Sequence, residues 1–161
     1  MEIREEIVAD HEAVRAVHNS AFGQSTEATL VDALRRDGDA EISLVAVVGD
    51  AVIGHIMLSR LTAPVRALAL APVAVAPSHQ NNGVGSKLIL ESLKRAKAQG
   101  WEAVFVLGEP AYYSRFGFSA DIAQAFISPY AGPYFMALEL VDDALVGKGE
   151  AVGYAQAFSA L

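Results

Sequence analysis

The sequence predicts an α/β fold, in which helices pack against a mixed central sheet. Three observations lead to this prediction. Apolar residues recur at helical spacing up to about residue 37, and the pattern becomes β-rich from there to residue 75. A strand, a glycine-rich loop, a helix and a further strand then follow between residues 67 and 107. No linker, repeat or charge block divides the 161 residues, so we expect one domain spanning residues 1–161.

The N-terminal part is predicted to form one strand and two helices. Residues 2–8 are rich in β-branched side chains, which favours a strand. Asp10 can cap the free amides of the helix that follows, whose apolar stripe continues to Ala21. A second helix is expected to begin near Ser25, and Gly38 is expected to end it.

The next segment, residues 42–62, predicts a hairpin because two β-rich runs flank the turn signal Gly49-Asp50. Residues 67–75 are apolar at almost every position, which is typical of a strand buried on both faces. Pro72 lies inside this run and has no backbone N–H to complete a ladder. We therefore expect the strand to bulge, or to separate from a neighbour, at this residue.

A βαβ unit follows. After the loop at residues 77–85, a helix is expected to reach Gln99 and to stop at Gly100. Residues 103–107 form a short apolar strand, which should run parallel to the strand before the loop. Beyond an aromatic turn, residues 134–141 predict one more strand.

Composition limits the chemistry that this chain can perform. It contains no cysteine, which excludes disulfides, thiolate metal sites, redox thiols and an acyl-cysteine intermediate. Twelve basic and 19 acidic residues give a net charge of −7, which opposes broad attraction to nucleic acid. No metal-ligand motif is present, so no metal site is expected.

The chain also shows no segment that predicts membrane insertion or export. The longest uncharged, mostly apolar run, residues 67–77, is about half the roughly 20 residues that a spanning helix needs. The start of the sequence is charged and has no apolar signal-peptide region. We therefore expect a cytoplasmic protein that does not bind membranes. The apolar C-terminal region makes a homodimer a further expectation.

The glycine-rich loop is the strongest candidate for a binding site. A loop of this kind, placed between a strand and a helix, directs several free N–H groups and the positive end of the helix dipole at one point, which suits a phosphate. The order of a Walker A loop is absent, since Lys87 is not preceded by the required glycines. The third glycine of a dinucleotide fingerprint is replaced by Leu88.

The remaining pattern resembles a known family. The loop Q-x-x-G-x-G at residues 80–85, which follows V-x-V-x-P at residues 73–77, resembles motif A of the GNAT superfamily of acetyl-CoA-dependent N-acetyltransferases. A second family element, Y-x-x-x-G-F, is matched at residues 113–118. Residues 107–118 and 135–140 are similar to a bacterial branch of predicted N-acetyltransferases whose substrates are poorly defined. The order of elements agrees with the family over at least residues 2–141.

This resemblance implies a fold, a cofactor and a set of site residues. It implies a mixed sheet of about seven strands, in which two parallel strands splay apart to hold acetyl-CoA. The pyrophosphate would lie on the loop amides, and the pantetheine would pair with the strand before the loop. The implied cofactor-binding residues are Val73, Ala74, Val75, Gln80, Asn81, Asn82, Gly83, Val84, Gly85 and Ser86.

The resemblance also implies catalytic roles. Tyr113 occupies the family's tyrosine position, and stabilisation of the departing thiolate by a hydrogen bond suits it better than full proton donation. The backbone amide of Val75 would contact the oxyanion. The strand before the loop lacks the glutamate that many members use as a base. Glu27, Glu109 and His55 are therefore the available bases, of which Glu109 is the one assigned to the site, and a water chain is a further option.

Two functions remain open at this point, beside a structural or partner-binding domain in which the glycine-rich loop is only a turn. The first is an N-acetyltransferase that acts on a primary amine of a small molecule or a protein. Without a cysteine, direct attack by the amine in a ternary complex is the natural route. The second is a non-catalytic acyl-CoA-binding or sensor module, which the missing strand glutamate favours.

Overall fold

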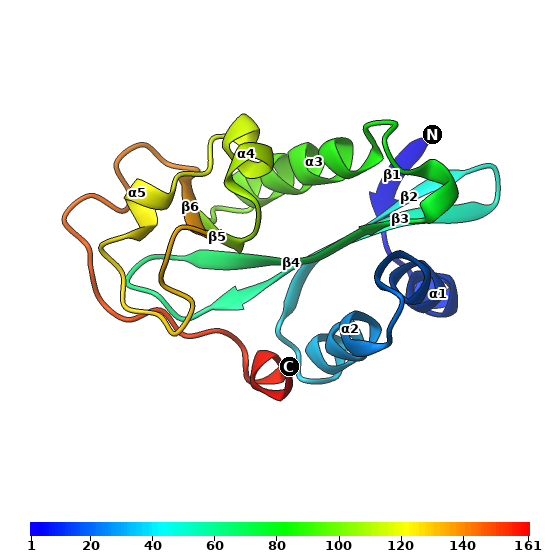
Figure 1. Cartoon of the computed structure of the whole chain (residues 1–161), viewed down its shortest axis with the longest axis horizontal. Helices are drawn as coiled ribbons and strands as arrows, with labels where there is room; N and C mark the ends of the chain where they lie inside the picture. The colour runs from blue at the N-terminus through cyan, green and yellow to red at the C-terminus, as the bar shows by residue number, and fades with distance from the viewer.

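The protein is built on one six-stranded mixed sheet, which confirms the predicted α/β class. The computed structural model describes all 161 residues. The strands lie in sequence order, and every neighbouring pair is antiparallel except β4 and β5, which are parallel (Figure 1). Their bounds are β1 Glu2–Glu5, β2 Ala40–Val48, β3 Ala51–Leu61, β4 Ala67–Val75, β5 Ala103–Leu107 and β6 Phe135–Glu139.

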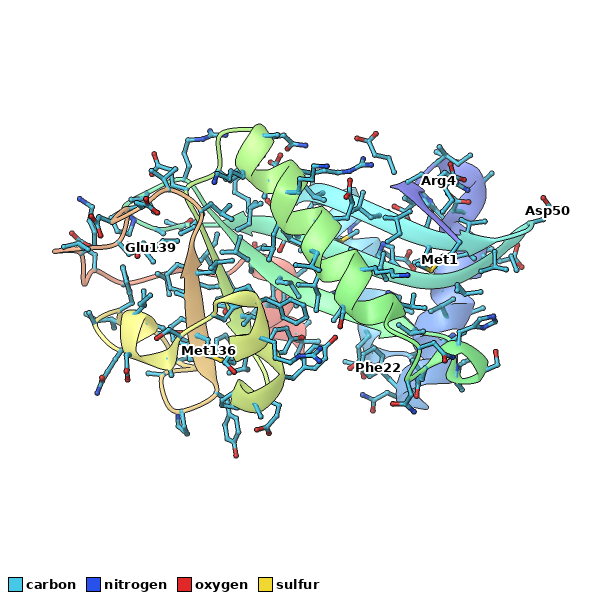
Figure 2. All side chains as sticks on the ribbon, turned by 90° about the horizontal axis from the view of Figure 1, so that it is seen from above. Met1, Arg4, Phe22, Asp50, Met136 and Glu139 are labelled. Atoms are coloured by element: carbon cyan, nitrogen blue, oxygen red, sulfur yellow. The ribbon has the colours of Figure 1, made fainter.

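Three longer helices cover the two faces of the sheet. Helices α1 and α2 lie on one face, and α3 runs diagonally across the other (Figures 1 and 2). Two short helices lie near β6. None of the helices is long and apolar enough to cross a membrane. The bounds are α1 His11–Phe22, α2 Thr26–Arg36, α3 Val84–Ala98, α4 Pro110–Tyr113 and α5 Ala120–Ala123.

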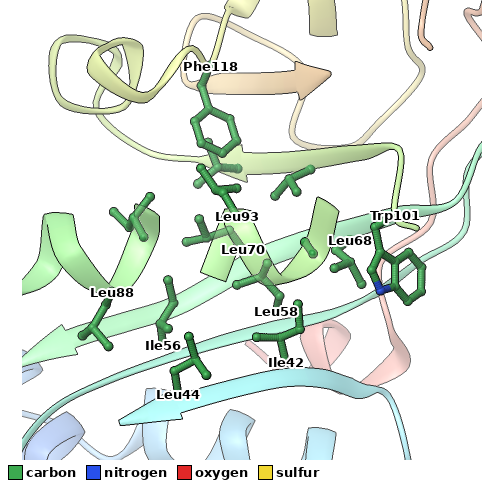
Figure 3. Packing of buried hydrophobic residues seen from close by; sticks show 14 of the residues in the cluster. Ile42, Leu44, Ile56, Leu58, Leu68, Leu70, Leu88, Leu93, Trp101 and Phe118 are labelled. Atoms are coloured by element: carbon green, nitrogen blue, oxygen red, sulfur yellow. The ribbon is translucent and has the colours of Figure 1, made fainter. Parts of the chain in front are cut away.

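The helices hold these positions because each presents an apolar stripe. Leu30 and Leu34 of α2 pack with Val45 of the sheet on one face. On the other face, Leu88 and Leu93 of α3 join the largest buried cluster, which Figure 3 shows between the helix and the strands. Burial of an aliphatic side chain of this size contributes about 1.5–3 kcal/mol. Residues of both β4 and α3 belong to this cluster, so the glycine-rich loop between them is held at both of its ends.

The N-terminal strand is shorter than expected. Strand β1 ends at Glu5, and a single 3₁₀ turn precedes α1. Asp10 stands at the N-cap of α1, but its side chain does not cap the helix. It instead accepts two hydrogen bonds from Arg4, at 2.8 and 3.0 Å, and one from the amide of Ile7 at 2.8 Å. The bidentate ion pair with Arg4 is stronger than a single hydrogen bond to an amide of the first helical turn, so Asp10 does not cap α1.

The sheet has six strands and not about seven, because the C-terminal region does not form a further strand. Near residues 151–153 the chain makes only isolated bridges, such as Thr62 with Gly153. Its apolar side chains are used for packing within the chain: Val152 and Phe158 are buried, and Phe158 packs with Leu30 beside α2. The last residues therefore close over the α2 side of the sheet (Figure 1).

The parallel strands β4 and β5 separate, as Pro72 predicts. They pair over only three residues, and the last pair is Ala69 with Phe105. On the other side, β3 shifts register between Ile56 and Leu58, which are paired with Val73 and Leu70. Residues 71 and 72 therefore oppose a single residue of β3, which is a bulge. The C-terminal halves of β4 and β5 are left with a gap between them.

Candidate active site

A polar hollow of about 440 Å³, here called the loop pocket, lies where β4 leads into α3. Asn81 and Gly83 adopt the left-handed conformation, with φ of 64° and 80°, which turns the chain sharply into the helix. Most of the predicted cofactor-binding residues meet here. The loop pocket is lined by Val75, His79, Gln80, Asn81, Gly83, Val84, Gly85, Ser86, Tyr112 and Arg115.

The start of α3 leaves backbone donors free at this pocket. No side chain caps the helix, and the first helical hydrogen bond runs from the amide of Lys87 to the carbonyl of Gly83 at 3.1 Å. The amides of the first turn therefore have no partner within the helix. Together with the helix dipole they form an anion site. Asn82 does not line the pocket; its side chain donates to the carbonyl of Gln80 at 3.2 Å and braces the loop.

Arg115 is a pocket residue that sequence reasoning missed. Its guanidinium donates to the hydroxyl of Ser86 at 3.0 Å and stacks over the ring of Tyr112, 4.7 Å from the centroid. It is the one Lys or Arg side chain in the lining of the loop pocket. The basic residues of α3 look equally close in the sequence, but Arg95 is paired with Glu91 at 3.0 Å. The signal for Arg115 was its place within the Y-x-x-x-G-F element.

The backbone of β4 turns alternate residues into the gap beside β5. The amide of Ala76 donates to Ile53 of β3 at 2.8 Å, and ladder bonds alternate along an antiparallel pair. The N–H and C=O groups of Ala74 therefore face β3, whereas those of Val73 and Val75 face the gap. The carbonyl of Val75 accepts a hydrogen bond from the side chain of Gln80 at 2.9 Å.

A second hollow of about 390 Å³, here called the apolar cavity, opens on the α2 side of the same gap. Eleven of its 13 lining residues are hydrophobic. They come from elements far apart in the sequence, including the C-terminal region. The lining consists of Phe22, Glu27, Leu30, Leu70, Ala71, Pro72, Val73, Leu107, Tyr113, Tyr130, Tyr154, Phe158 and Leu161.

Tyr113 projects into the apolar cavity, and its neighbour Tyr112 projects into the loop pocket. The helical turn of α4 directs the two side chains apart. Their rings are nearly perpendicular, with centroids 5.1 Å apart. Gly108 makes room for Tyr113, since a Cβ at that position would stand 2.4 Å from its ring. Burial, with a smaller contribution from Tyr112, raises the pKa of Tyr113 to about 12. The hydroxyl is thus a neutral hydrogen-bond donor at ordinary pH.

Of the two candidate glutamate bases, the structure brings only Glu27 to Tyr113. Glu27 lies in the first turn of α2 and lines the apolar cavity. Glu109 is exposed and lines neither hollow. It stands at the N-cap of α4, where its carbonyl accepts hydrogen bonds from the amides of Tyr112 and Tyr113, both at 3.1 Å.

His55 is enclosed in the interior and faces neither hollow. Its Nδ1 lies 2.8 Å from Nε2 of His18, and its Nε2 lies 2.8 Å from the hydroxyl of Ser43, which donates to Glu6. Because Ser43 has one proton to donate, His55 must donate from Nε2 and accept at Nδ1. Burial lowers the pKa of both histidines, to about 4 for His18. Both rings are neutral, and the lone pair of His55 is already used.

The geometry can be compared with known proteins. A family model described as the acetyltransferase (GNAT) family matches residues 7–118. YhbS of Escherichia coli K12, an uncharacterized N-acetyltransferase, is 33 % identical over 165 residues, with 99 % of both sequences covered. YjhQ of the same organism, also an uncharacterized N-acetyltransferase, is 37 % identical over 134 residues, which cover 78 % of this chain and 74 % of YjhQ.

Two solved structures are similar over nearly the whole chain, and both contain a form of coenzyme A. The complex of E. coli YhbS with CoA superposes with a TM-score of 0.92, at 33 % identity, and covers 98 % of this chain and 91 % of YhbS. A GNAT family acetyltransferase from Brucella melitensis in complex with acetyl-CoA superposes with a TM-score of 0.82, at 33 % identity, covering 98 % and 97 %. The matched sequence and the shared architecture show that this chain belongs to the GNAT family of N-acetyltransferases.

Proposed function

We propose that the protein transfers an acetyl group from acetyl-CoA to a primary amine, by direct attack in a ternary complex. The observation that carries the proposal is the convergence of three features on the gap between β4 and β5. These are the free amides at the start of α3, the outward-facing backbone of Val73 and Val75, and the hydroxyl-bearing ring of Tyr113. The CoA and acetyl-CoA bound by the two similar structures support the choice of cofactor.

The residues of the gap and the loop pocket fit coenzyme A. The first-turn amides of α3 and the guanidinium of Arg115 suit phosphate oxygens. The outward N–H and C=O groups of Val73 suit an amide of a pantetheine arm, much as they would suit a neighbouring strand. At Val75 the carbonyl is already bound by the side chain of Gln80, which leaves its outward amide for the thioester end. Ala74 and Asn82 support the cofactor site indirectly. Ala74 holds the strand in place through its pairing with β3, and Asn82 holds the loop through its hydrogen bond to Gln80.

Bound acetyl-CoA would supply an activated acetyl thioester. The amide of Val75, directed into the gap, donates to the thioester oxygen as negative charge develops on it. Tyr113 donates a hydrogen bond to the sulfur. Full proton transfer from a tyrosine of pKa about 12 to a thiolate of ordinary pKa near 8.5 is uphill by about 5 kcal/mol. Tyr113 therefore stabilises the leaving group without losing its proton.

The amine must be neutral before it attacks. Glu27 lies in the same cavity as Tyr113 and is placed to accept the proton of an ammonium group, whereas Glu109 is not. After the proton moves to Glu27, the nitrogen forms its bond to the acetyl carbon and the carbon–sulfur bond breaks. The second amine proton leaves to the thiolate or to water. No acyl-enzyme is needed, in keeping with a chain that has no cysteine.

Two measurements test the proposal. Calorimetry should detect binding of acetyl-CoA, and a thiol reagent should detect CoA release when an amine panel is added. The protein itself contains no thiol, so the signal belongs to CoA alone. Failure to bind acetyl-CoA at millimolar concentration would overturn the proposal.

The second candidate function is a non-catalytic acyl-CoA-binding or sensor module. Residues 68–71 of β4 carry no carboxylate, which favours this alternative. It would be supported if acetyl-CoA bound but no amine in a broad panel released CoA. Clear release with one amine would exclude it.

A further inference from the structure

The apolar cavity has the size and the position of an acceptor site. Its volume of about 390 Å³ lies within the range of small-molecule pockets, roughly 300–1,000 Å³. It is bounded on one side by the separated part of β4, from Leu70 to Val73, and on another by Tyr113. A molecule inside it would therefore lie next to the gap in which the thioester is proposed to bind.

Glu27 is the one charged residue in the lining of this cavity. Its carboxylate accepts hydrogen bonds from the side chain of Gln24 at 3.2 and 3.3 Å, and it has no ion pair with any basic residue. A position in the first turn of a helix is favourable for a carboxylate by itself. The helix dipole alone does not explain why the carboxylate of Glu27 lies beside an apolar wall.

The arginines of the two helices α1 and α2 are all paired with other carboxylates. Arg15 of α1 is paired with Asp32 at 2.7 Å. Arg35 of α2 binds Glu6 and Asp32. The negative charge of Glu27 thus remains open toward the cavity, and a cationic ligand is its natural complement.

The rest of the lining is mostly apolar and aromatic, which suits the apolar part of a ligand. Tyr154 packs edge-on against Tyr130 and Phe158, with centroids 5.0 and 5.2 Å away, so three aromatic rings form one wall. Aromatic faces also attract cations.

We infer that the acetyl acceptor is a primary amine on an apolar body, whose ammonium binds Glu27 and whose alkyl or aromatic part fills the apolar cavity. This inference rests on the proposed function. It assigns Glu27 a role in acceptor recognition and makes polyamines and highly charged acceptors poor substrates. A polar chain with several charges would leave charged groups against apolar walls, which is unfavourable.

The first test is binding to the protein saturated with CoA, which cannot turn over. Calorimetry compares 2-phenylethylamine with its uncharged isostere 2-phenylethanol, on the wild type and on Glu27→Gln. The wild type should prefer the amine, and the variant should lose roughly 10- to 100-fold in amine affinity, because a hydrogen bond to a charged group is lost, with little change for the alcohol. Equal losses for both ligands would overturn the role of Glu27.

A matched control separates this effect from helix stability. Glu12 is also an acidic residue in the first turn of a helix, but it is exposed and lines no cavity described above. Glu12→Gln should leave the amine affinity unchanged. If it reduced the affinity as much as Glu27→Gln does, the effect would come from long-range charge, and the inference would fail.

The second test is acetyl transfer, measured as CoA release. With the wild type, kcat/KM for 2-phenylethylamine should exceed that for ethylamine and for spermidine by at least about tenfold. Equal or better use of spermidine would overturn the acceptor class and leave the proposed function intact. Tight binding of 2-phenylethylamine without CoA release would support the cavity as an amine site and overturn the proposed function.

A change in the cavity wall gives an independent check. Phe22 lines the cavity and is 41 % exposed, so Phe22→Ser should not prevent folding. It should lower kcat/KM for 2-phenylethylamine about 3- to 10-fold and leave ethylamine nearly unchanged, because only the larger body reaches the wall. Loss of the same factor for both amines would contradict the inference.

Discussion

Tyr112 and Tyr113 are adjacent in the chain, yet their rings enter two hollows of opposite character. The loop pocket around Tyr112 is polar, and most of its lining comes from one short segment, residues 79–86. The apolar cavity around Tyr113 is lined by residues that are spread along the sequence from Phe22 to Leu161. The two hollows meet at the gap between β4 and β5. We therefore expect that binding of the cofactor and recognition of the proposed acceptor can be changed independently by mutation.

The largest expected effect comes from removal of the hydroxyl on the cavity side. Tyr113→Phe should lower kcat roughly 100- to 1,000-fold, because the departing thiolate loses its hydrogen-bond donor, and should leave the affinity for acetyl-CoA unchanged. Tyr112→Phe is the matched control and should keep kcat within a few-fold. Steady-state kinetics and calorimetry on both variants measure this contrast. Equal losses in kcat for the two variants would show that catalysis does not depend on the apolar cavity more than on the loop pocket.

The two hollows also differ in how much of them the sequence predicts. The loop pocket follows from residues 80–86, because free amides after a strand and a glycine turn bind anions wherever they occur. Pro72 likewise predicts that β4 separates from a neighbour. The apolar cavity could not be predicted, since Leu30 and Phe158 have the pattern of ordinary core residues. Only the fold brings them beside Tyr113.

Some individual residues of the site could likewise not be placed from the sequence alone. The sequence favours Glu109 over Glu27 as the base, and only the packing of α2 beside β4 brings Glu27 to the cavity of Tyr113. The pair His18 and His55 joins residues 37 positions apart, which no local pattern reveals. The seventh strand was expected from the family pattern. The structure replaces it with isolated bridges, because Val152 and Phe158 are taken up by packing against the sheet.

Acid should lower the folding stability first in the region around the apolar cavity. The ring of His18 stacks on Phe22 of the cavity wall, with centroids 6.0 Å apart, and is buried and neutral. Its pKa is about 4 in the folded state, against 6.5 for an unperturbed histidine. Between these values the unfolded chain binds a proton that the folded chain does not. Stability is therefore lost as the pH falls from about 6.5 toward 4.

For His18 alone, this loss amounts to about 2 kcal/mol by pH 5, and His55 adds to it in the same direction. Chemical unfolding between pH 7 and 5 measures the total, and His18→Asn should flatten the dependence. Amide hydrogen exchange at pH 5 should rise more in α1 than in α3. Equal protection of both helices would contradict a local effect.

A smaller effect is expected where Gly108 makes room for Tyr113. A Cβ at this position would stand 2.4 and 2.9 Å from atoms of the tyrosine ring, so Gly108→Ala must displace the ring. We expect kcat to fall about tenfold, since a misplacement of about 1 Å costs up to 100-fold, while acetyl-CoA affinity stays within twofold. Gly149→Ala, far from Tyr113 in sequence and also crowded at 3.0 Å by a backbone oxygen, controls for general strain. If both variants lose stability but only Gly108→Ala loses kcat, the effect is positional.

The smallest expected effect lies on the loop-pocket side. Arg115→Gln removes the one guanidinium in that lining, whose present partners are Ser86 and the ring of Tyr112. Because the group is exposed, its attraction for a phosphate is screened by solvent, and we expect acetyl-CoA affinity to fall only about 3- to 10-fold. Calorimetry at two salt concentrations should show a weaker salt dependence in the variant, with kcat at saturating acetyl-CoA and the preference among amines unchanged. A change in amine preference would mean that the two hollows are coupled through the tyrosine pair, because Arg115 contacts Tyr112 and lines only the loop pocket.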